Sequence, residues 1–335
     1  MKSLKIVIAG GNGYLGRLLS RYFAERDNQI VVLSRRPLPD VPGVRQVRWD
    51  GVHPGSWMIE LENADALINL AGRSVNCRYT ARNRQAIYAS RLQSTVVLGQ
   101  AIAACASPPR VWLNSSSATI YRHAEDREMD EATGEIGSGF SVDVCQKWER
   151  ALDESPAPHT RKVALRSAMV MGPGSDGVFE AFHRLVRWRL GGRLGDGRQF
   201  VSWVHGQDFI RAVEWILEND SLSGAINISS PNPLPNEDFM RILREATQRE
   251  IGLPSSAWML ALGAVFLRTE TELLLKSRRV IPARLLGDGF IFHHPHWESA
   301  VRDLLRQPIH PLLDDHFERL HEPLHASTGE RTFRS

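Results

Sequence analysis

The segment from residue 4 to residue 34, LKIVIAGGNGYLGRLLSRYFAERDNQIVVLS, decides the fold of this chain. Residues 4–9 form a continuous apolar run rich in β-branched side chains, which predicts a buried strand. Glycines follow, and apolar residues then recur at helical spacing as far as Phe23. A second apolar run, residues 29–34, comes within the length of one crossover connection. Two strands joined in this way are parallel and their connection is right-handed, so the segment is predicted to form a βαβ unit.

The glycines of AGGNGYLG, residues 9–16, indicate a binding site for a diphosphate. Gly10, Gly13 and Gly16 follow the strand directly and open the helix. A turn this tight favours residues without a Cβ, and the amides at the start of a helix attract a phosphate. Glycine triplets also occur in ordinary turns, but within a complete βαβ unit they favour a dinucleotide cofactor. The residues of this turn that we expect to contact the cofactor are Gly10, Asn12, Gly13, Tyr14, Leu15 and Gly16.

The end of the second predicted strand distinguishes NADP from NAD. NAD sites usually place an acidic residue there to bind the ribose hydroxyls, whereas this chain has Ser34, Arg35 and Arg36, which can donate hydrogen bonds to a 2′-phosphate. NADP, as NADPH, is therefore the predicted cofactor, although arginines are also common in solvated loops. We expect Asp50 to accept a hydrogen bond from the adenine. The other expected cofactor contacts, each of which also fits an ordinary strand-end turn, are Leu70, Ala71, Gly72 and Ser115.

The alternation of strand and helix continues beyond the first unit. Further buried strands are predicted at residues 44–49, 66–70, 111–115, 163–166 and 225–229. Helices are predicted to begin near Thr80, Val142 and Val178. Such alternation specifies an α/β fold, a doubly wound parallel sheet with helices on both faces.

A proline-rich stretch after Ser230 opens a different region. We predict a nucleotide-binding domain at residues 1–230, with an excursion over the cleft at about 172–206, a smaller and mainly helical lobe at 231–306, and a tail at 307–335. Asn236 is the predicted cap of the first helix in the lobe, and helices continue to about Leu275. The apolar run from Trp258 to Leu267 is about half of the roughly 20 residues that cross a bilayer, so it is predicted to be a buried or surface-docked helix.

The composition argues against several classes of partner. Lysine and arginine number 41 against 38 aspartate and glutamate residues, so no global field draws the chain onto nucleic acid or an anionic membrane. A small polar ligand is the better expectation, bound by a monomer or a homodimer. Cys77, Cys105 and Cys145 have no metal-like spacing, so no metal site is predicted. With no secretory leader visible, these cysteines favour the cytoplasm.

Three segments resemble the extended short-chain dehydrogenase/reductases of the NAD-dependent epimerase/dehydratase family, namely GGNGYLG at 10–16, NLAG at 69–72 and SSSATIY at 115–121. The resemblance implies a Rossmann fold that binds a nicotinamide dinucleotide, with Ser117 as the active-site hydroxyl and Tyr121 as the tyrosine that usually follows it. Three further segments are similar to an atypical branch of "epimerase family proteins" that ends in a C-terminal domain of unknown function. They are LRSAMVMGPGS at 165–175, RLGDGRQFVSWVH at 193–205 and SRRVIPARLLGDGFIFHHP at 277–295, and the similarity covers roughly residues 3–306.

The chain departs from this family at a Tyr-x-x-x-Lys pair on the helix after the serine. In family members, the lysine and the cofactor lower the pKa of the tyrosine, which then moves a proton at neutral pH. Counting back from Trp148, the tyrosine position falls on Ser141 and the lysine position on Cys145. A serine hydroxyl is a far weaker acid than a phenol, and a thiol carries no fixed positive charge. Lys147 is rotated about 200° around the helix from Cys145, so the usual dyad is predicted to be missing.

Ser117 and Tyr121 remain the predicted catalytic residues, because they stand where parallel strands end. Ser117 could instead bind a substrate oxygen or the cofactor carboxamide without moving a proton, and Tyr121 could pack its ring and hydrogen-bond its hydroxyl. His205 is a further candidate acid or base, but in the family that the chain resembles a histidine here, followed by Asp208, positions the capping region, and this structural role is favoured. Arginines that either bind an anion or lie in solvent are Arg78, Arg82, Arg91, Arg193 and Arg198. Residues expected to build the second lobe and its seam with the sheet are Arg279, Pro282, Arg284 and Phe292.

Two functions are consistent with these residues. The first is an NADP-dependent oxidoreductase or epimerase of a small carbonyl or alcohol substrate, which the glycine turn, the arginines and Ser117 favour. The second is a catalytically silent NADP(H)-binding sensor or scaffold protein, which the missing dyad favours. Because one fold serves many functions, fold alone does not choose between them.

Overall fold

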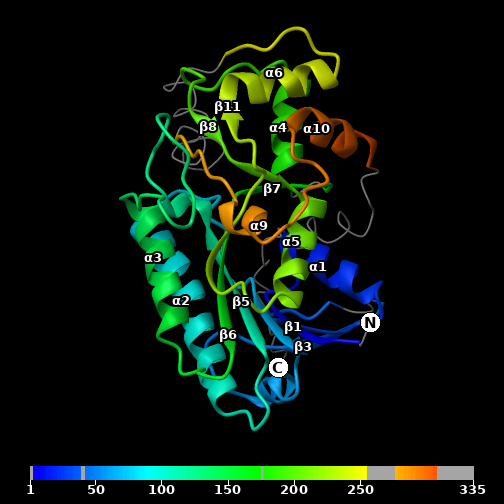
Figure 1. Cartoon of the computed structure of the whole chain (residues 1–335), viewed down its shortest axis with the longest axis vertical. Helices are drawn as coiled ribbons and strands as arrows, with labels where there is room; N and C mark the ends of the chain where they lie inside the picture. Colours follow the sequence, from blue (N-terminus) through cyan, green and yellow to red (C-terminus); the bar gives the residue numbers. More distant parts are fainter. Residues whose placement is uncertain (1–2, 39–41, 175–176, 255–275, 308–335) are drawn as a thin grey trace, which may run out of the picture.

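Strand pairing fixes the order of the central sheet. In the computed structural model, which describes residues 3–38, 42–174, 177–254 and 276–307, seven strands form one parallel sheet in the order β10-β6-β5-β4-β1-β2-β3 (Figure 1). In chain order these are β1 (Lys5–Ala9), β2 (Gln29–Ser34), β3 (Val44–Arg48), β4 (Ala66–Asn69), β5 (Val111–Ser117), β6 (Arg161–Ser167) and β10 (Gly224–Ile228). The doubly wound parallel sheet is confirmed, and each predicted strand lies within about two residues of its observed bounds.

Helices cover both faces of the sheet (Figure 1). One face carries α2 (Ala81–Ala103), α3 (Phe140–Asp153) and the short η1 (Ser56–Leu61), and the other carries α1 (Tyr14–Ala24) and α5 (Gly206–Glu218). Ile6 and Ile8 of β1 pack on the side of α1 and α5. Val7 and Ala9, one residue out of phase, pack on the side of α2. A strand buried on both faces has no polar alternation, which is why β1 reads as a continuous apolar run.

A smaller lobe lies at one end of the molecule, at the top of Figure 1. Its elements are α4 (Val178–Arg187), β8 (Phe200–Val201), β11 (Leu234–Pro235), α6 (Asn236–Ala246) and α10 (Trp297–Arg306). Its core contains a group of aromatic rings, with Phe239 and Trp297 stacked at 4.1 Å and Phe182 edge-on to Phe239 at 5.2 Å. The smaller, mainly helical lobe is confirmed. Its core also contains residues of the predicted excursion, and the proposed boundary at residue 230 stays a prediction.

Three short elements join the two parts of the molecule. β7 (Met169–Met171) pairs with β9 (Trp203–His205), and α9 (Ala283–Gly287) packs near β10. The guanidinium of Arg284 in α9 donates to the backbone oxygens of Ser223 and Ala225, at the start of β10. Phe292 joins the core between the sheet and α5. The expectation that these residues form the seam with the sheet therefore agrees with their contacts.

The predicted helix starts hold in part. Thr80 caps α2 by accepting a hydrogen bond from the amide of Asn83, and α4 begins at Val178 as predicted. The prediction that Asn236 caps a helix is wrong, because Asn236 is the first residue of α6 and Pro235 precedes it. The Asn236 side chain accepts instead from the amide of Leu194, 2.8 Å away in the excursion. This buried amide group is used for tertiary packing rather than for a local cap.

Several predictions lie outside the described residues. They are the helices continuing to Leu275, the apolar run from Trp258 to Leu267, and nearly all of the tail at 307–335. In the part of the chain that is described, no helix combines the length and apolar character that crossing a bilayer requires.

Candidate functional site

Close packing of backbone explains two of the three predicted glycines. Gly10 has a φ of +77°, and a Cβ built on it would lie 2.8 Å from the Cα of Ala71, at the end of β4. A Cβ on Gly16 would lie 2.4 Å from the Cα of Gly11. Both distances are far below van der Waals contact, so a side chain at either position would push α1 or β4 away from β1.

Gly13 differs from these two glycines, because no close contact with the described residues fills the space beside it. Its φ is −72°, it is exposed, and the nearest atom to a Cβ there would be the oxygen of Gly10, at 3.4 Å. No side chain of the described residues caps the N-terminus of α1, which Gly13 precedes. Helix N-terminal amides that the protein leaves without a side-chain cap are available to a phosphate.

Tyr14 and Leu15 have their backbone amides at this N-terminus, but their side chains face the protein. A Cβ built on Gly172 would lie only 2.3 Å from the hydroxyl of Tyr14. The Tyr14 side chain therefore packs against the segment after β7. Leu15 packs against the core between α1 and the sheet. Any contact of these two residues with a phosphate would therefore be made by the backbone.

Asn12 holds the loop that carries the two predicted phosphate-binding arginines. Its Nδ2 donates to the hydroxyl of Ser34 at 2.9 Å and to the backbone oxygen of Arg36 at 2.8 Å. Ser34 is buried at the end of β2, whereas Arg35 and Arg36 are exposed. The glycine turn and the arginine loop are thus one hydrogen-bonded unit, and both guanidinium groups are accessible to a ligand.

Two residues that no sequence motif singled out also hold this unit together. Gln46, in the middle of β3, donates from its Nε2 to the Oδ1 of Asn12 at 3.2 Å. Arg17 donates from Nη1 to the backbone oxygen of Asn12 at 2.7 Å. A polar residue at the centre of a predicted strand was the available signal for Gln46. Nothing comparable marks Arg17, since a second arginine, Arg21, lies one turn further along the same helix.

The carboxylate of Asp50 is hydrogen-bonded within its own turn. It accepts from the amides of Val52 at 2.8 Å and His53 at 2.9 Å, and its other oxygen lies 2.7 Å from Nδ1 of His53. The hydrogen bond from the His53 amide contributes most to holding the pKa of Asp50 at about 2. The carboxyl is therefore ionised at neutral pH, and its contact with an adenine stays a prediction.

The ends of β4 and β5 are tied together by buried amides. Asn69 is fully buried and donates to the Oδ1 of Asn114 at 2.7 Å, while its own Oδ1 accepts from the amide of Ala71 at 3.0 Å. Arg91 of α2 donates to the backbone oxygen of Arg73, just beyond Gly72. Leu70, Ala71 and Gly72 are thereby held beside Gly10. Here β2 lies on one side of β1 and β4 on the other, so the strand order reverses at this point of the sheet. Open α/β sheets bind ligands at such a switch point.

Ser115 and Ser117 lie at the carboxyl end of β5, and both are half-buried. The oxygen of Ser117 accepts from the backbone amide of Thr119 at 3.2 Å and from the Thr119 hydroxyl at 3.0 Å. The Thr119 oxygen lies 3.5 Å from the sulfur of Cys145 on α3. The side chain at the lysine position inferred above is thus linked to the predicted catalytic serine through one threonine.

Tyr121 is fully buried, and its hydroxyl is engaged on both sides. It donates to Oδ1 of Asn227 at 2.9 Å and accepts from Nη1 of Arg166 at 2.9 Å. Burial raises the pKa of Tyr121, more than the neighbouring guanidinium of Arg166 lowers it. The alternative of a packed, hydrogen-bonded tyrosine fits this position better than the predicted catalytic role does. Lys147 points away from Cys145 and forms a 2.7 Å ion pair with Asp143.

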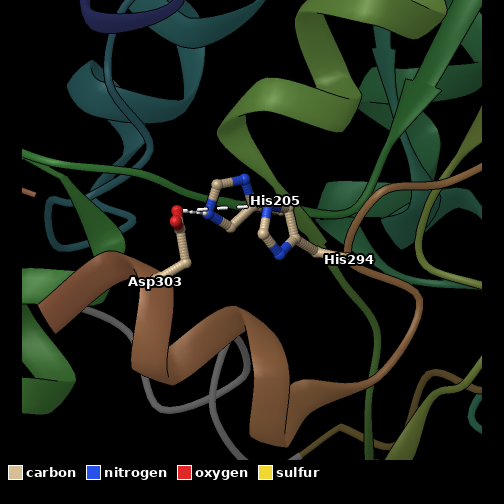
Figure 2. A group of neighbouring side chains, drawn as sticks. All are labelled: His205, His294 and Asp303. Carbon is tan, nitrogen blue, oxygen red and sulfur yellow. Dashed lines mark ion pairs between the residues drawn. The ribbon is translucent and has the colours of Figure 1, made fainter. Parts of the chain in front are cut away.

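His205, His294 and Asp303 come together where α5, the 277–295 motif and α10 meet (Figure 2). The two imidazole rings lie 4.0 Å apart, and Nε2 of His205 lies 3.2 Å from Oδ2 of Asp303. His205 caps α5, because its Nδ1 accepts from the amide of Gln207 at 3.1 Å. Asp208, fully buried, accepts from the amides of His293 and His294 at 2.8 Å each. The expected positioning role of His205 and Asp208 agrees with these contacts.

The same cluster has the residue types of a metal site, but its hydrogen bonding opposes one. A backbone amide can only donate, so Nδ1 of His205 is unprotonated and Nε2 carries the proton in the neutral ring. Metal-ligating histidines show the reverse arrangement, in which the second nitrogen donates and the ligating nitrogen is bare. We therefore interpret the cluster of His205, His294 and Asp303 as a contact that holds α5 and α10 together, and we call it the clasp.

Stability is expected to fall at acidic pH because of this clasp. Burial, followed by the proximity of His294, lowers the pKa of His205 to about 4, against a value near 6.5 in the unfolded chain. Between these values the unfolded state binds more protons, so stability is lost as the pH falls. We expect His205 to account for about 2 kcal/mol of lost stability at pH 5 relative to pH 7.5.

Denaturant unfolding of wild type and His205→Asn at both pH values measures this contribution. Asparagine keeps an N-cap acceptor but does not titrate, and Asp208 and Asp303 are unchanged in both proteins. The wild type should lose more stability than the variant on acidification. Equal losses in the two proteins would contradict the assignment.

The remaining predicted arginines do not converge on one site. Arg78, Arg82 and Arg193 are exposed, and Arg91 lies over the ring of Trp148. Arg198 forms a 3.3 Å ion pair with Glu125 and lines a cavity of about 370 Å³. The other residues of this cavity are Glu125, Gly197, Phe200, Pro235, Glu237 and Asp238. With three carboxylates for one guanidinium, it does not favour an anionic substrate.

Comparisons with known proteins agree with this architecture. The family model of the NAD dependent epimerase/dehydratase family matches residues 6–229, and that of a domain of unknown function, DUF1731, matches residues 256–304. The epimerase family protein SDR39U1 of Bos taurus is 30% identical over 310 residues, which cover 90% of this chain and 100% of the relative. The epimerase family protein ML0860 of Mycobacterium leprae is 31% identical over 292 residues, covering 86% and 92%.

A solved structure is similar over the same length. The crystal structure of human epimerase family protein SDR39U1 (isoform 2) with NADPH superposes with a TM-score of 0.79 at 27% identity, covering 90% of this chain and 99% of the human one. The two family models together cover the glycine turn, nearly all of the parallel sheet and the C-terminal motif. The chain belongs to the NAD dependent epimerase/dehydratase family, in the branch of epimerase family proteins that carry a DUF1731 domain.

Proposed function

We propose that this chain binds NADP(H) and acts as an oxidoreductase or epimerase on a small carbonyl or alcohol substrate. The observation that carries the proposal is the unit formed by Gly13, Asn12 and the arginine loop. It offers uncapped helix amides to a diphosphate and two accessible guanidinium groups to a 2′-phosphate. The human SDR39U1 structure with NADPH supports the same cofactor here.

The sheet order gives the bound dinucleotide a direction. The diphosphate would sit above β1, and the adenosine half would extend over β2 and β3, where the arginine loop stands. The nicotinamide half would then extend the other way, over β4 and β5. Ser117 is the last residue of β5, on the nicotinamide side of the sheet. Its hydroxyl is therefore available to the reacting end of the cofactor or to a substrate beside it.

The chemistry follows from what each side chain can do. NADPH would supply a hydride to a carbonyl carbon. Ser117 would donate a hydrogen bond to the carbonyl oxygen, which stabilises the negative charge that develops there. Tyr121 is occupied by Asn227 and Arg166, and burial raises the pKa of the Cys145 thiol, so neither offers an acid matched to neutral pH. We propose that the proton comes from water.

Binding and turnover together test this proposal. Purified protein is titrated with NADPH, and oxidation of the reduced nicotinamide is followed by absorbance with a panel of small aldehydes and ketones. We expect saturable NADPH binding and turnover with at least one compound, with the turnover reduced in Ser117→Ala and little changed in Tyr121→Phe. A protein that binds no nicotinamide dinucleotide would refute the whole proposal.

A second candidate function is a catalytically silent NADP(H)-binding sensor or scaffold. The observation that favours it is the buried thiol of Cys145 at the lysine position of the family motif. Tight NADPH binding without turnover anywhere in the panel would support it over the enzyme. Both candidates take the chain as a cytoplasmic monomer or homodimer, with a cofactor domain at residues 1–230, a lobe at 231–306 and a tail at 307–335.

A further inference from the structure

The hydroxyl of Ser117 has both lone pairs occupied. A serine oxygen accepts at most two hydrogen bonds and donates one. Here the two accepted bonds come from the amide and the hydroxyl of Thr119, at 3.2 and 3.0 Å. Among the described residues no acceptor is found for the proton of Ser117 itself, and the side chain is half-buried rather than covered. Thr119 therefore does not use the proton of Ser117, which is available to an acceptor outside the described residues.

The direction of the bond between Thr119 and Ser117 is set by the third member of the chain, Cys145. The Thr119 hydroxyl has two neighbours, the oxygen of Ser117 at 3.0 Å and the sulfur of Cys145 at 3.5 Å. The hydrogen-bond geometry has the Thr119 hydroxyl donating to Ser117, and the sulfur of Cys145 is the weaker acceptor of the two neighbours. The thiol of Cys145 is 3% exposed and keeps its proton, because burial raises its pKa. It can therefore donate to the Thr119 oxygen, which completes a one-way relay of hydrogen bonds.

We propose that Thr119 and Cys145 are positioning residues, which fix Ser117 as an outward hydrogen-bond donor to a carbonyl oxygen at the nicotinamide end of the cofactor site. A serine held in this way binds an acceptor without first giving up another bond, but it cannot accept a proton as a base. The carbonyl oxygen comes either from the carboxamide of the cofactor or from a substrate beside it. This inference rests on the proposed binding of NADP(H).

The carboxamide source is tested with the thionicotinamide analogue of NADPH, in which a weakly accepting sulfur replaces the carboxamide oxygen. Affinities for NADPH and for this analogue are measured by calorimetry in the wild type, Ser117→Ala, Thr119→Val and Thr119→Ser. We expect the wild type to prefer NADPH by about 2- to 12-fold, the range of one neutral hydrogen bond. Thr119→Val, which is nearly isosteric, should lose most of this preference as Ser117→Ala does, and Thr119→Ser should keep it.

The substrate source is tested by kcat and KM for any carbonyl compound that the panel reveals. In that case Thr119→Val should lower kcat by a similar factor while NADPH affinity stays unchanged, and Thr119→Ser should restore it. Cys145→Ala should show the same change as Thr119→Val in weaker form. If Thr119→Val, correctly folded by its thermal midpoint, changes neither the affinity ratio nor kcat, the inference is overturned.

A third ligand separates this failure from failure of the proposed function. 2′-Phospho-ADP-ribose keeps the diphosphate and the 2′-phosphate but lacks the nicotinamide. All the variants should bind it as the wild type does. If the wild type binds neither this compound nor NADPH, the cofactor proposal itself fails and the inference falls with it. If all proteins bind it equally and no difference follows with NADPH or a substrate, only the role of Thr119 and Cys145 is refuted.

Discussion

Gly13→Ala is expected to weaken NADPH binding strongly while leaving the protein as stable as the wild type. A Cβ at this position would meet only the oxygen of Gly10, at 3.4 Å, and the backbone φ of −72° suits alanine. The methyl group would instead occupy the space that the diphosphate needs beside the start of α1. We expect affinity for NADPH to fall at least about 100-fold, equivalent to about 2.7 kcal/mol.

Gly16→Ala provides the matched comparison, because it adds the same methyl group three residues away. There the Cβ would lie 2.4 Å from the Cα of Gly11, inside the packing of α1 against β1. Overpacking of this kind costs about 1–3 kcal/mol of folding stability, so this variant should unfold at lower temperature than Gly13→Ala. Calorimetric titration with NADPH and thermal unfolding of both variants measure the two effects. Wild-type affinity in Gly13→Ala would place the diphosphate elsewhere.

Replacing Arg35 and Arg36 together by alanine is expected to weaken NADPH binding about 10- to 100-fold and NADH binding little. Charge-assisted hydrogen bonds to a phosphate are among the stronger polar contacts, and NADH has no 2′-phosphate to use them. Both arginines are exposed, and their loop is held by Asn12 through backbone and Ser34 contacts, so the substitution should not disturb the fold.

A control for this variant must remove the same net charge elsewhere. Arg302 and Arg306 are both exposed on α10, in the smaller lobe, and their double alanine variant changes the net charge equally. It should bind NADPH as the wild type does at the same ionic strength. Equal weakening of NADPH and NADH by the Arg35 and Arg36 variant, or equal effects of the two double variants, would contradict a 2′-phosphate site at this loop.

The predictable part of the site is the part that local sequence encodes. The strand β2 was predicted with its observed bounds, and the glycine turn with its tight contacts, because an apolar run and residues without a Cβ are short-range signals. The short strands β7, β8, β9 and β11 were not predicted, since strands of two or three residues exist only through their partners. Asn236 was misread for a related reason, because its partner, Leu194, is 42 residues away.

The sequence by itself determined the α/β class, the βαβ unit, the glycine turn and the arginines that follow β2, because each depends on neighbours within about thirty residues. Only the tertiary structure decided the surroundings of the chemical groups. Folding buried Tyr121 between Asn227 and Arg166, and it brought Cys145 to Thr119 and His205 to Asp303. The physical reason is that burial and hydrogen-bond partners, which set what a hydroxyl, a thiol or an imidazole can do, come from chain segments far apart in sequence.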